Sequence, residues 1–457
     1  MGTALPVREL YCPSHFGNEY ESAMANEMRA TLEEARFWGF NRYSDWFDTI
    51  DLYDLYAPRG RKLFNLPEAV WERKFSNFAV AADLGFDLGL VVTPNHVFSD
   101  QVTAATAAVA DGHYFGQLVC PQKAGVAEMI CRNYRQLFSD FAARGLRLGT
   151  LSAGAYDYGG CGCAACKPWI VSFGKLFVQI LAEAEAVFGP VNADLWGWWW
   201  TDEDHEAFGA WADREAPGRF TALANHILYG ETSYKVRRLP QGCSERAFTH
   251  IGYGEKGGID VYGHYGPTVA PRRLQATVEF LVQRGASGFL AYSEGTFDEA
   301  NKVILAGLAS GQYPSAAAVL EAYAERYFGG AARGWAEWLA AMGDVEAMDP
   351  AKARREFDLL ARGSRSSERL QAWEEKLRLR EADVRVQQAA QWDAERLAAA
   401  AAFWAAKERL WRGLWRRGLC RHIFRFDYQA PRWQAEYAQH GRRTPLASAL
   451  SATSKEA

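Results

Sequence analysis

Residues 195–204 combine aromatic rings and carboxylates in one short run, Leu-Trp-Gly-Trp-Trp-Trp-Thr-Asp-Glu-Asp. An apolar, aromatic run that ends abruptly in charge is typical of a buried strand. Asp202, Glu203 and Asp204 would then lie at the C-terminal end of that strand. Because carboxylates transfer protons and flat rings pack on the apolar faces of sugars, the run indicates carbohydrate chemistry. The alternative is that the tryptophans are core residues and the acids begin the next helix, where negative charge is favourable.

Polar, acidic or imidazole groups follow nearly every apolar run in the first 310 residues. These endings are Ser14–Asn18, Asp45–Asp48, Thr93–His96, Tyr156–Gly160, Asp202–Asp204, Gly263–Tyr265 and Ser293–Gly295. In a parallel barrel, active sites are built at the C-terminal ends of the strands. Seven such endings in register would converge on one pocket with several carboxylates.

The elements that would position these groups alternate between short apolar runs and amphipathic stretches, which predicts a (β/α)8 barrel over residues 1–312. Candidate strands are Val7–Cys12, Arg42–Phe47, Asp87–Thr93, Tyr114–Val119, Arg147–Ala153, Asp194–Thr201, Ile259–His264 and Gly288–Ser293, with Phe248–Tyr253 as a further candidate and Tyr114–Val119 alternatively a loop. Candidate helices between them include Ser22–Trp38, Pro67–Leu84, Val126–Ala143, Phe173–Phe188 and Pro271–Arg284.

Residues 313–445 have helical spacing throughout and predict an α-helical C-terminal domain. Its expected helices are Ser315–Phe328, Ala331–Met342 and a long region from Ser367 to Arg417. This domain could pack against the barrel or against a second subunit, forming a homodimer. Residues 446–457 are expected to be a disordered tail.

The composition is that of a soluble globular protein, with 49% hydrophobic and 23% charged residues. A net charge of −4 offers no electrostatic case for binding nucleic acid or an anionic membrane. No stretch is apolar for long enough to cross a membrane, and residues 1–9 lack the regions of a secretory signal, so the expected location is the cytoplasm.

Several short motifs resemble the barrel of glycoside hydrolase family 20, the β-N-acetylhexosaminidases, and related sugar-active barrels. They are Arg8-Glu9-Leu10 with His15-Phe16, Asn41 with Trp46 and Asp48, Pro94-Asn95-His96, Cys120-Pro121 and Tyr292-Ser293-Glu294. The resemblance covers roughly residues 5–310. At the fourth strand, where the family has Asp-Glu, this chain has Asp157-Tyr158, so the family's acid is missing.

The resemblance and the residues together predict a glycoside hydrolase that works by carboxylate acid/base catalysis. Glu203 is the expected general acid, because a carboxyl walled by Trp198, Trp199 or Trp200 would be desolvated and its pKa raised. Asp202 or Asp157 would be its partner. The expected sugar-binding residues are Arg8, His15, Asp48, His96, Trp200, His264, Tyr265 and Glu294. The alternative is a catalytically inert carbohydrate-binding barrel, which the Tyr at position 158 motivates.

Cys161, Cys163 and Cys166 are spaced closely enough to bind a structural zinc ion, with Cys120 or Cys12 as a fourth ligand. The alternative is three reduced thiols in a Gly-rich turn. The glycosidase hypothesis requires no cofactor. A third hypothesis is a metal-dependent enzyme centred on these cysteines or on His205 and its neighbouring acids.

Overall fold

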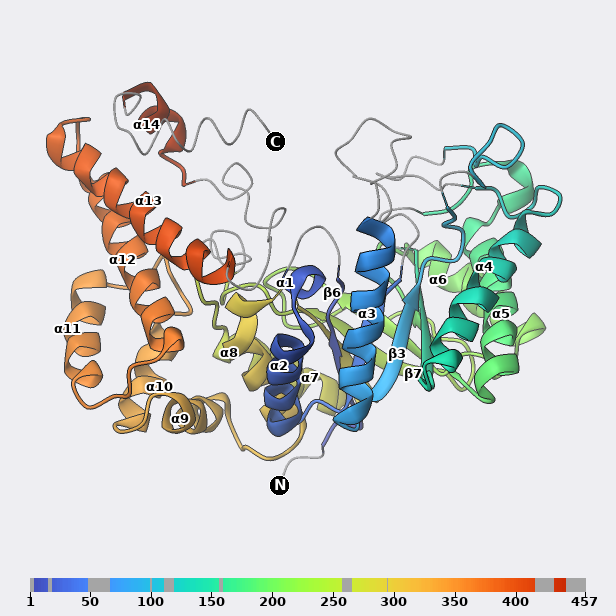
Figure 1. The fold of residues 1–457 in the computed structure, drawn as a ribbon, viewed down its shortest axis with the longest axis horizontal. Coiled ribbons are helices and arrows are strands. Elements are labelled where there is room, and N and C mark those ends of the chain that lie inside the picture. The colour runs from blue at the N-terminus through green and yellow to red at the C-terminus, as the bar shows by residue number, and fades with distance from the viewer. Residues whose placement is uncertain are drawn as a thin grey trace.

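The computed structural model describes residues 4–14, 19–47, 66–98, 101–110, 119–155, 159–256, 265–293, 295–415 and 431–440. Its centre is a closed barrel of eight parallel strands in sequence order (Figure 1). The strands are β1 (Val7–Tyr11), β2 (Arg42–Trp46), β3 (Asp87–Val92), β4 (Thr150–Gly154), β5 (Asn192–Trp196), β6 (Ala222–Ile227), β7 (Ser244–His250) and β8 (Gly288–Tyr292). The predicted (β/α)8 architecture is therefore confirmed.

Six of the predicted strands correspond to barrel strands, and two do not. The predicted strands Tyr114–Val119 and Ile259–His264 lie outside the described residues, except for Val119, which makes one isolated antiparallel bridge to Ala107. The sixth and seventh strands of the barrel are instead β6, which the sequence analysis missed, and β7, which overlaps the further candidate Phe248–Tyr253. The run of β6, Ala-Leu-Ala-Asn-His-Ile, is short and partly polar, so its apolar signal is weak.

The barrel helices are α1 (Glu19–Ser22), α2 (Ala25–Trp38), α3 (Leu66–Asp83), α4 (Val126–Ala143), α5 (Trp169–Phe188), α6 (Asp202–Glu215), α7 (Pro271–Arg284) and α8 (Glu299–Ala309). Residues 228–243, all described, connect β6 to β7 without a helix. This segment runs along α6, where Arg238 pairs with Glu206 at 3.1 Å and with Asp213 at 2.7 Å. An extended segment thus takes the place of the sixth barrel helix.

The N-terminal end of the barrel interior holds a layer of charged side chains. Arg42 pairs with Asp87 at 2.8 Å and with Asp194 at 3.1 Å, and Arg246 pairs with the same oxygen of Asp194. Glu9 lies in this layer and accepts a hydrogen bond of 2.5 Å from the Ser44 hydroxyl. Burial raises the pKa of Glu9, and the nearby Arg42 opposes that shift. In most barrels of this kind, branched apolar side chains fill the interior layers. In this layer, ion-paired side chains fill the space instead.

The remaining helices lie on one side of the barrel, opposite α4, α5 and α6 (Figure 1). They are α9 (Ala316–Tyr327), α10 (Ala332–Ala341), α11 (Pro350–Ala361), α12 (Glu368–Gln388), α13 (Ala394–Trp415) and α14 (Gln434–His440). Over the described residues, the long helical region expected from Ser367 to Arg417 consists of two helices, α12 and α13, because the chain turns at residues 389–393. Asp393 ends the turn by accepting a hydrogen bond of 2.9 Å from the backbone N–H of Arg396.

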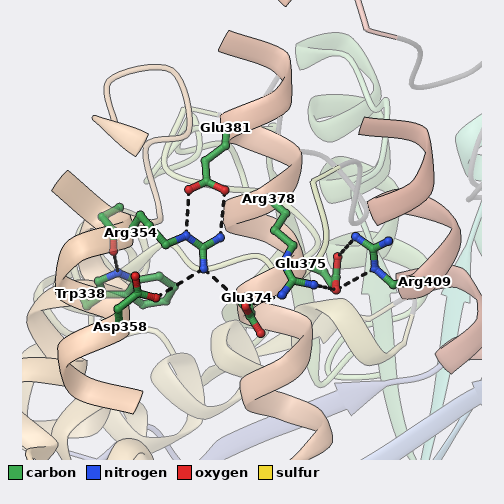
Figure 2. Close-up of polar contacts among 9 residues, drawn as sticks. Trp338, Arg354, Asp358, Glu374, Glu375, Arg378, Glu381 and Arg409 are labelled. Atoms are coloured by element: carbon green, nitrogen blue, oxygen red, sulfur yellow. Dashed lines mark hydrogen bonds and ion pairs between the residues drawn. The ribbon is translucent and has the colours of Figure 1, made fainter. Parts of the chain in front are cut away.

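Helices α9–α12 share a core with the barrel, and ion pairs join α11 and α13 to α12. One continuous apolar core runs from the barrel strands to Trp335, Trp338 and Leu377. Arg354 of α11 makes a forked contact of 2.8 and 2.9 Å with Glu381 of α12 (Figure 2). A second fork joins Arg409 of α13 to Glu375 of α12. Among the described residues, no helix is long and apolar enough to cross a membrane. The tail expected at 446–457 lies outside the described residues.

Candidate functional site

The C-terminal end of the barrel carries a continuous group of aromatic and imidazole rings, which we call the mouth cluster. Its members are Tyr11, Trp198, His226, Tyr229, Phe248, His250, Tyr253 and Tyr292. Strand register brings them together, because Tyr11 pairs with Tyr292, and Tyr292 pairs with His250. Below them, Trp196 packs edge-on against Tyr11 at 4.8 Å between ring centroids.

Two histidines lie side by side within this cluster. The ring centroids of His226 and His250 are 5.1 Å apart, and Trp198 lies 3.7 Å from His226 and 5.2 Å from His250. His250 is buried. Within the described part of the chain, Nε2 of His226 and both ring nitrogens of His250 have no hydrogen-bond partner. Buried polar atoms normally have partners, so these nitrogens are available to a bound molecule.

Burial keeps both imidazoles neutral. It lowers the pKa of His226 to about 3. It also lowers the pKa of His250 well below its ordinary value, with help from His226 and from the cation of Arg273. A neutral imidazole offers one donor and one acceptor. The pair can therefore bind hydroxyl groups, but it is poorly suited to hold a proton near neutral pH.

The loop after β7 is held in place by buried polar contacts. The Arg273 guanidinium, at the start of α7, donates to the carbonyls of Gly254 at 3.2 Å, Tyr253 at 3.0 Å and His250 at 3.4 Å. Asn301 of α8 donates to the Tyr253 carbonyl at 3.0 Å as well. These contacts fix the backbone on both sides of the His250 and Tyr253 rings.

The histidine pair predicts a loss of stability in acid. An unfolded histidine has a pKa of about 6.5 and takes up a proton below that pH, whereas folded His226 stays neutral down to about pH 3. The stabilisation is therefore complete above about pH 6.5 and is lost as the pH falls toward 3. At pH 5, His226 alone should lower the free energy of unfolding by about 2 kcal/mol relative to neutral pH.

Urea unfolding at about pH 7.5 and about pH 5 measures this loss. The His226→Phe variant should reduce the difference between the two pH values by about 2 kcal/mol. His440→Gln, which changes an exposed histidine on α14, serves as the control. Equal pH dependence in His226→Phe and in the unmodified chain would contradict the prediction.

The three consecutive tryptophans after β5 point in different directions. Trp198 joins the mouth cluster, whereas Trp200 is buried against His205 and Phe208 of α6. Trp199 is 53% exposed and adopts a left-handed backbone conformation, with φ +58°. A bulky residue with positive φ is uncommon, and such strain is often found at functional sites. The ring of Trp199 is thus presented to solvent beside the cluster, 6.4 Å from His226.

The carboxylates that follow these tryptophans form the start of α6. Thr201 is the N-cap: its hydroxyl accepts from the backbone N–H of Asp204 at 3.2 Å, and the Asp204 carboxylate accepts from the Thr201 N–H at 3.0 Å. The expected burial of Glu203 against tryptophan is wrong, because Glu203 is exposed. Asp202 is also exposed, and hydrogen bonds from Lys235 and Arg237 lower its pKa. The three acids therefore form the first turn of α6, as the alternative in the sequence analysis expected.

Arg8, Trp200 and Tyr265, three of the expected sugar-binding residues, make structural contacts instead. Arg8 lies at the N-terminal end of the barrel, where its guanidinium donates to the carbonyls of Gly39 and Leu5, both at 2.5 Å. The Tyr265 hydroxyl donates to Asp383 of α12 at 2.6 Å. With Trp200 in the core, the structure brings none of these three into the mouth cluster.

His96 lies in the turn after β3, where it is buried and its backbone N–H donates to the Thr93 carbonyl at 3.0 Å. Five other predicted site residues lie outside the described residues: His15, Asp48, Asp157, His264 and Glu294.

A buried polar network surrounds the C-terminal end of β8. The Ser293 hydroxyl donates to Asp298 at 2.9 Å, and the Asp298 carboxylate pairs with Lys302 at 2.9 Å. Tyr20 of α1 shares a short hydrogen bond with the Ser293 hydroxyl. The residue before Glu294 is therefore anchored on two sides.

Sequence reasoning missed His226 and His250. Each ends or nearly ends a strand, so imidazoles at the ends of apolar runs were the available signal. A shallow groove on the outer surface, lined in part by Lys175, Trp211 and Arg214 between α5 and α6, lies on the flank of the barrel. Ligands of this fold bind at the strand ends, so we take the mouth cluster as the candidate site.

Four cysteines form the group suited to a metal among the described residues: Cys120, Cys161, Cys163 and Cys166. Cys120 is the expected fourth member, whereas Cys12 lies apart from them, at the end of β1. His205 is packed against Trp200 in the core, and burial lowers its pKa to about 4. His205 does not belong to a metal-binding group in the described part of the chain.

No family model matches the chain, and no curated protein matches it. Among solved structures, the chain is similar to a GH138 enzyme targeting pectin rhamnogalacturonan II, with 9% identity and a TM-score of 0.51 over 92% of this chain and 63% of that one. It is also similar to a GH89 protein from Clostridium perfringens in complex with its substrate GlcNAc-α-1,4-galactose, with 12% identity and a TM-score of 0.55 over 90% of this chain and 53% of that one.

The chain thus spans less than two thirds of the length of either protein. At these identities the similarity shows the fold alone. Neither protein is described as a family 20 enzyme, so the comparisons support a barrel of the kind found in glycoside hydrolases and not that family in particular.

Proposed function

We propose that this protein is a glycosidase that binds a sugar ring at the mouth cluster. The observation that carries the proposal is the juxtaposition of His226 and His250, with unpartnered nitrogens, against the rings of Trp198 and Tyr229. Sugars present apolar C–H faces and hydroxyl edges. Aromatic rings suit the faces, and neutral imidazoles suit the hydroxyls.

We propose that Asp157 and Glu294 supply the catalytic carboxylates. Each follows a barrel strand closely in the chain, Asp157 after β4 and Glu294 after β8. In the closed order of strands, three strands separate β4 from β8 in either direction. The ends of β4 and β8 therefore lie on opposite sides of the barrel mouth. Asp202 is ion-paired and Glu203 is exposed at the start of α6, so neither has the dry surroundings that suit a general acid.

In this mechanism one carboxyl group protonates the leaving oxygen and the other stabilises the positive charge that develops on the sugar. The second group acts as a nucleophile when the two lie about 5 Å apart, or activates a water when they lie about 6.5–9.5 Å apart. The histidine pair would hold ring hydroxyls and orient the sugar, without moving protons itself.

A second candidate is a carbohydrate-binding barrel without catalysis. It is favoured by Tyr158, which stands where the family 20 resemblance places the acid, and by the exposure of Glu203 to solvent. The two candidates share the sugar-binding site and differ only in turnover.

A panel of aryl glycosides and oligosaccharides, with product anomers identified by NMR, tests the proposal. Turnover with one anomeric outcome supports the glycosidase. Calorimetric binding without product after long incubation supports the binding protein. Neither turnover nor binding across the panel would contradict both candidates.

Trp199 is expected to be a stacking platform for the sugar, because its ring is exposed beside the histidine pair. Trp199→Ala and Trp199→Gly should each weaken binding of the sugar found in that panel by on the order of tenfold. Because glycine tolerates positive φ, Trp199→Gly should be more stable than Trp199→Ala by about 1 kcal/mol.

Fluorescence titration measures the affinity, and urea unfolding measures the stability. Leu359→Ala, which removes an exposed apolar side chain on α11, is the control. Unchanged affinity in both Trp199 variants would remove Trp199 from the site.

A further inference from the structure

Four cysteine sulfurs from two separate loops meet beside the C-terminal end of the barrel. Cys120 lies in the loop between β3 and α4, and Cys161, Cys163 and Cys166 lie in the loop between β4 and α5. The four Sγ atoms all lie within 4.8 Å of one another. Two loops that are far apart in the sequence therefore present four soft ligands to one point.

The distances between the sulfurs fit a tetrahedral metal site. A zinc–sulfur bond of about 2.3 Å places the corners of a regular tetrahedron about 3.8 Å apart. The Sγ of Cys120 lies 3.8 Å from that of Cys163 and 3.6 Å from that of Cys166. A disulfide would require about 2.05 Å, so the cysteines are arranged as four ligands and not as two oxidised pairs.

The backbone also helps to position the sulfurs. The N–H of Val109 donates to the Sγ of Cys161 at 3.4 Å. The N–H of Cys166 donates to the Cys163 carbonyl at 3.1 Å, which holds these two cysteines in one tight turn. A donor to sulfur stabilises the negative charge of a thiolate, and metal-bound ligands typically have partners of this kind.

We infer that Cys120, Cys161, Cys163 and Cys166 bind one structural zinc ion, which joins the loop after β3 to the loop after β4. Four protein ligands complete a tetrahedral shell and leave no open position, as in structural zinc sites. Binding releases the thiol protons as each sulfur becomes a thiolate. The inference stands on the cysteines alone and does not depend on the proposed glycosidase activity.

The location gives the ion a role at the edge of the barrel mouth. Residues 159–166 lead from the C-terminal side of β4 to α5, and the backbone there is closely packed. A Cβ added to Gly160 would lie 2.5 Å from the Cβ of Trp169. A metal ion that holds Cys161, Cys163 and Cys166 would fix this part of the rim.

Metal analysis of the full chain, purified without chelator, is the first test. The expected result is one zinc per chain. After replacement by Co²⁺, absorption bands of thiolate-to-cobalt charge transfer and of tetrahedral cobalt are expected. A chain that purifies without metal and binds Co²⁺ without thiolate bands would overturn the inference. If the bound metal is iron, the inference that the ion is zinc is wrong.

Variants of single cysteines supply the second test. Cys120→Ser and Cys166→Ser should lose the zinc, whereas Cys131→Ser should retain it, because Cys131 is a buried cysteine of α4 outside the cluster. Mercurial titration of the unmodified chain, with a chromogenic zinc indicator, should release one zinc per chain as the four thiols react, so the inference remains testable if a variant fails to fold. Retention of zinc by both cluster variants would refute it.

Discussion

The Asp157→Asn and Glu294→Gln variants are each expected to lower kcat by about 10²–10⁴-fold on a substrate that the unmodified protein cleaves. Both replacements keep the shape of the side chain and remove its charge and its ability to transfer a proton. Binding should change much less than kcat, because the mouth cluster stays intact. Steady-state kinetics on the aryl glycoside identified in the panel, with circular dichroism to confirm folding, measures the effect.

Glu203→Gln is the matched control for these variants. It makes the same chemical change as Glu294→Gln, but at an exposed position in the first turn of α6. We expect its kcat to remain within a few-fold of that of the unmodified protein. The opposite pattern, with activity lost in Glu203→Gln and retained in the other two variants, would return the role of general acid to α6.

The Asp194→Ala variant is expected to lose about 3–5 kcal/mol of unfolding free energy. Asp194 is buried inside the barrel between the guanidinium groups of Arg42 and Arg246. Its removal leaves two cations close together in a site with little water. Removing one partner of a buried ion pair destabilises the protein by more than the whole pair stabilises it, because the remaining charge is left buried without a partner. Urea unfolding followed by circular dichroism and by tryptophan fluorescence measures the change.

Asp202→Ala is the matched control, since Asp202 also contacts two cations, Lys235 and Arg237, but at the surface. Solvent screens an exposed pair, so little loss of stability is expected there. If the two variants lose the same unfolding free energy, the buried ion pairs of Asp194 do not stabilise the barrel more than a surface pair does. Because Asp194 lies in the barrel interior below Trp196 and is not part of the mouth cluster, Asp194→Ala should change sugar binding much less than stability at temperatures where the protein stays folded.

The sequence by itself determined the barrel, most of its strands and the helical character of the described residues from 316 to 415. These features depend on local apolar periodicity, which a single chain displays directly. Helices α4 and α7 match their predicted bounds for the same reason. The close spacing of Cys161, Cys163 and Cys166 within one Gly-rich segment also predicted that they could bind one metal ion.

Other features were decided only by tertiary contacts. The short, partly polar strand β6 is recognisable from its pairing with β5 and β7, and not from its own composition. His226 and His250 lie on different strands and meet only because the barrel aligns those strands. Adjacent tryptophans differ in the same way: Trp199 is exposed and Trp200 is buried, because the path of the loop after β5 sets the direction of each side chain.

Asp202, Glu203 and Asp204 show most clearly why the sequence alone does not identify a catalytic acid. Sequence alone left open whether Asp202, Glu203 and Asp204 act as catalysts or begin a helix. A general acid needs surroundings with little water, and the exposure of a residue depends on how distant segments cover it. The tertiary structure leaves Glu203 exposed and assigns Asp204 to the cap of α6, while the rings that precede these acids help to form the mouth of the barrel.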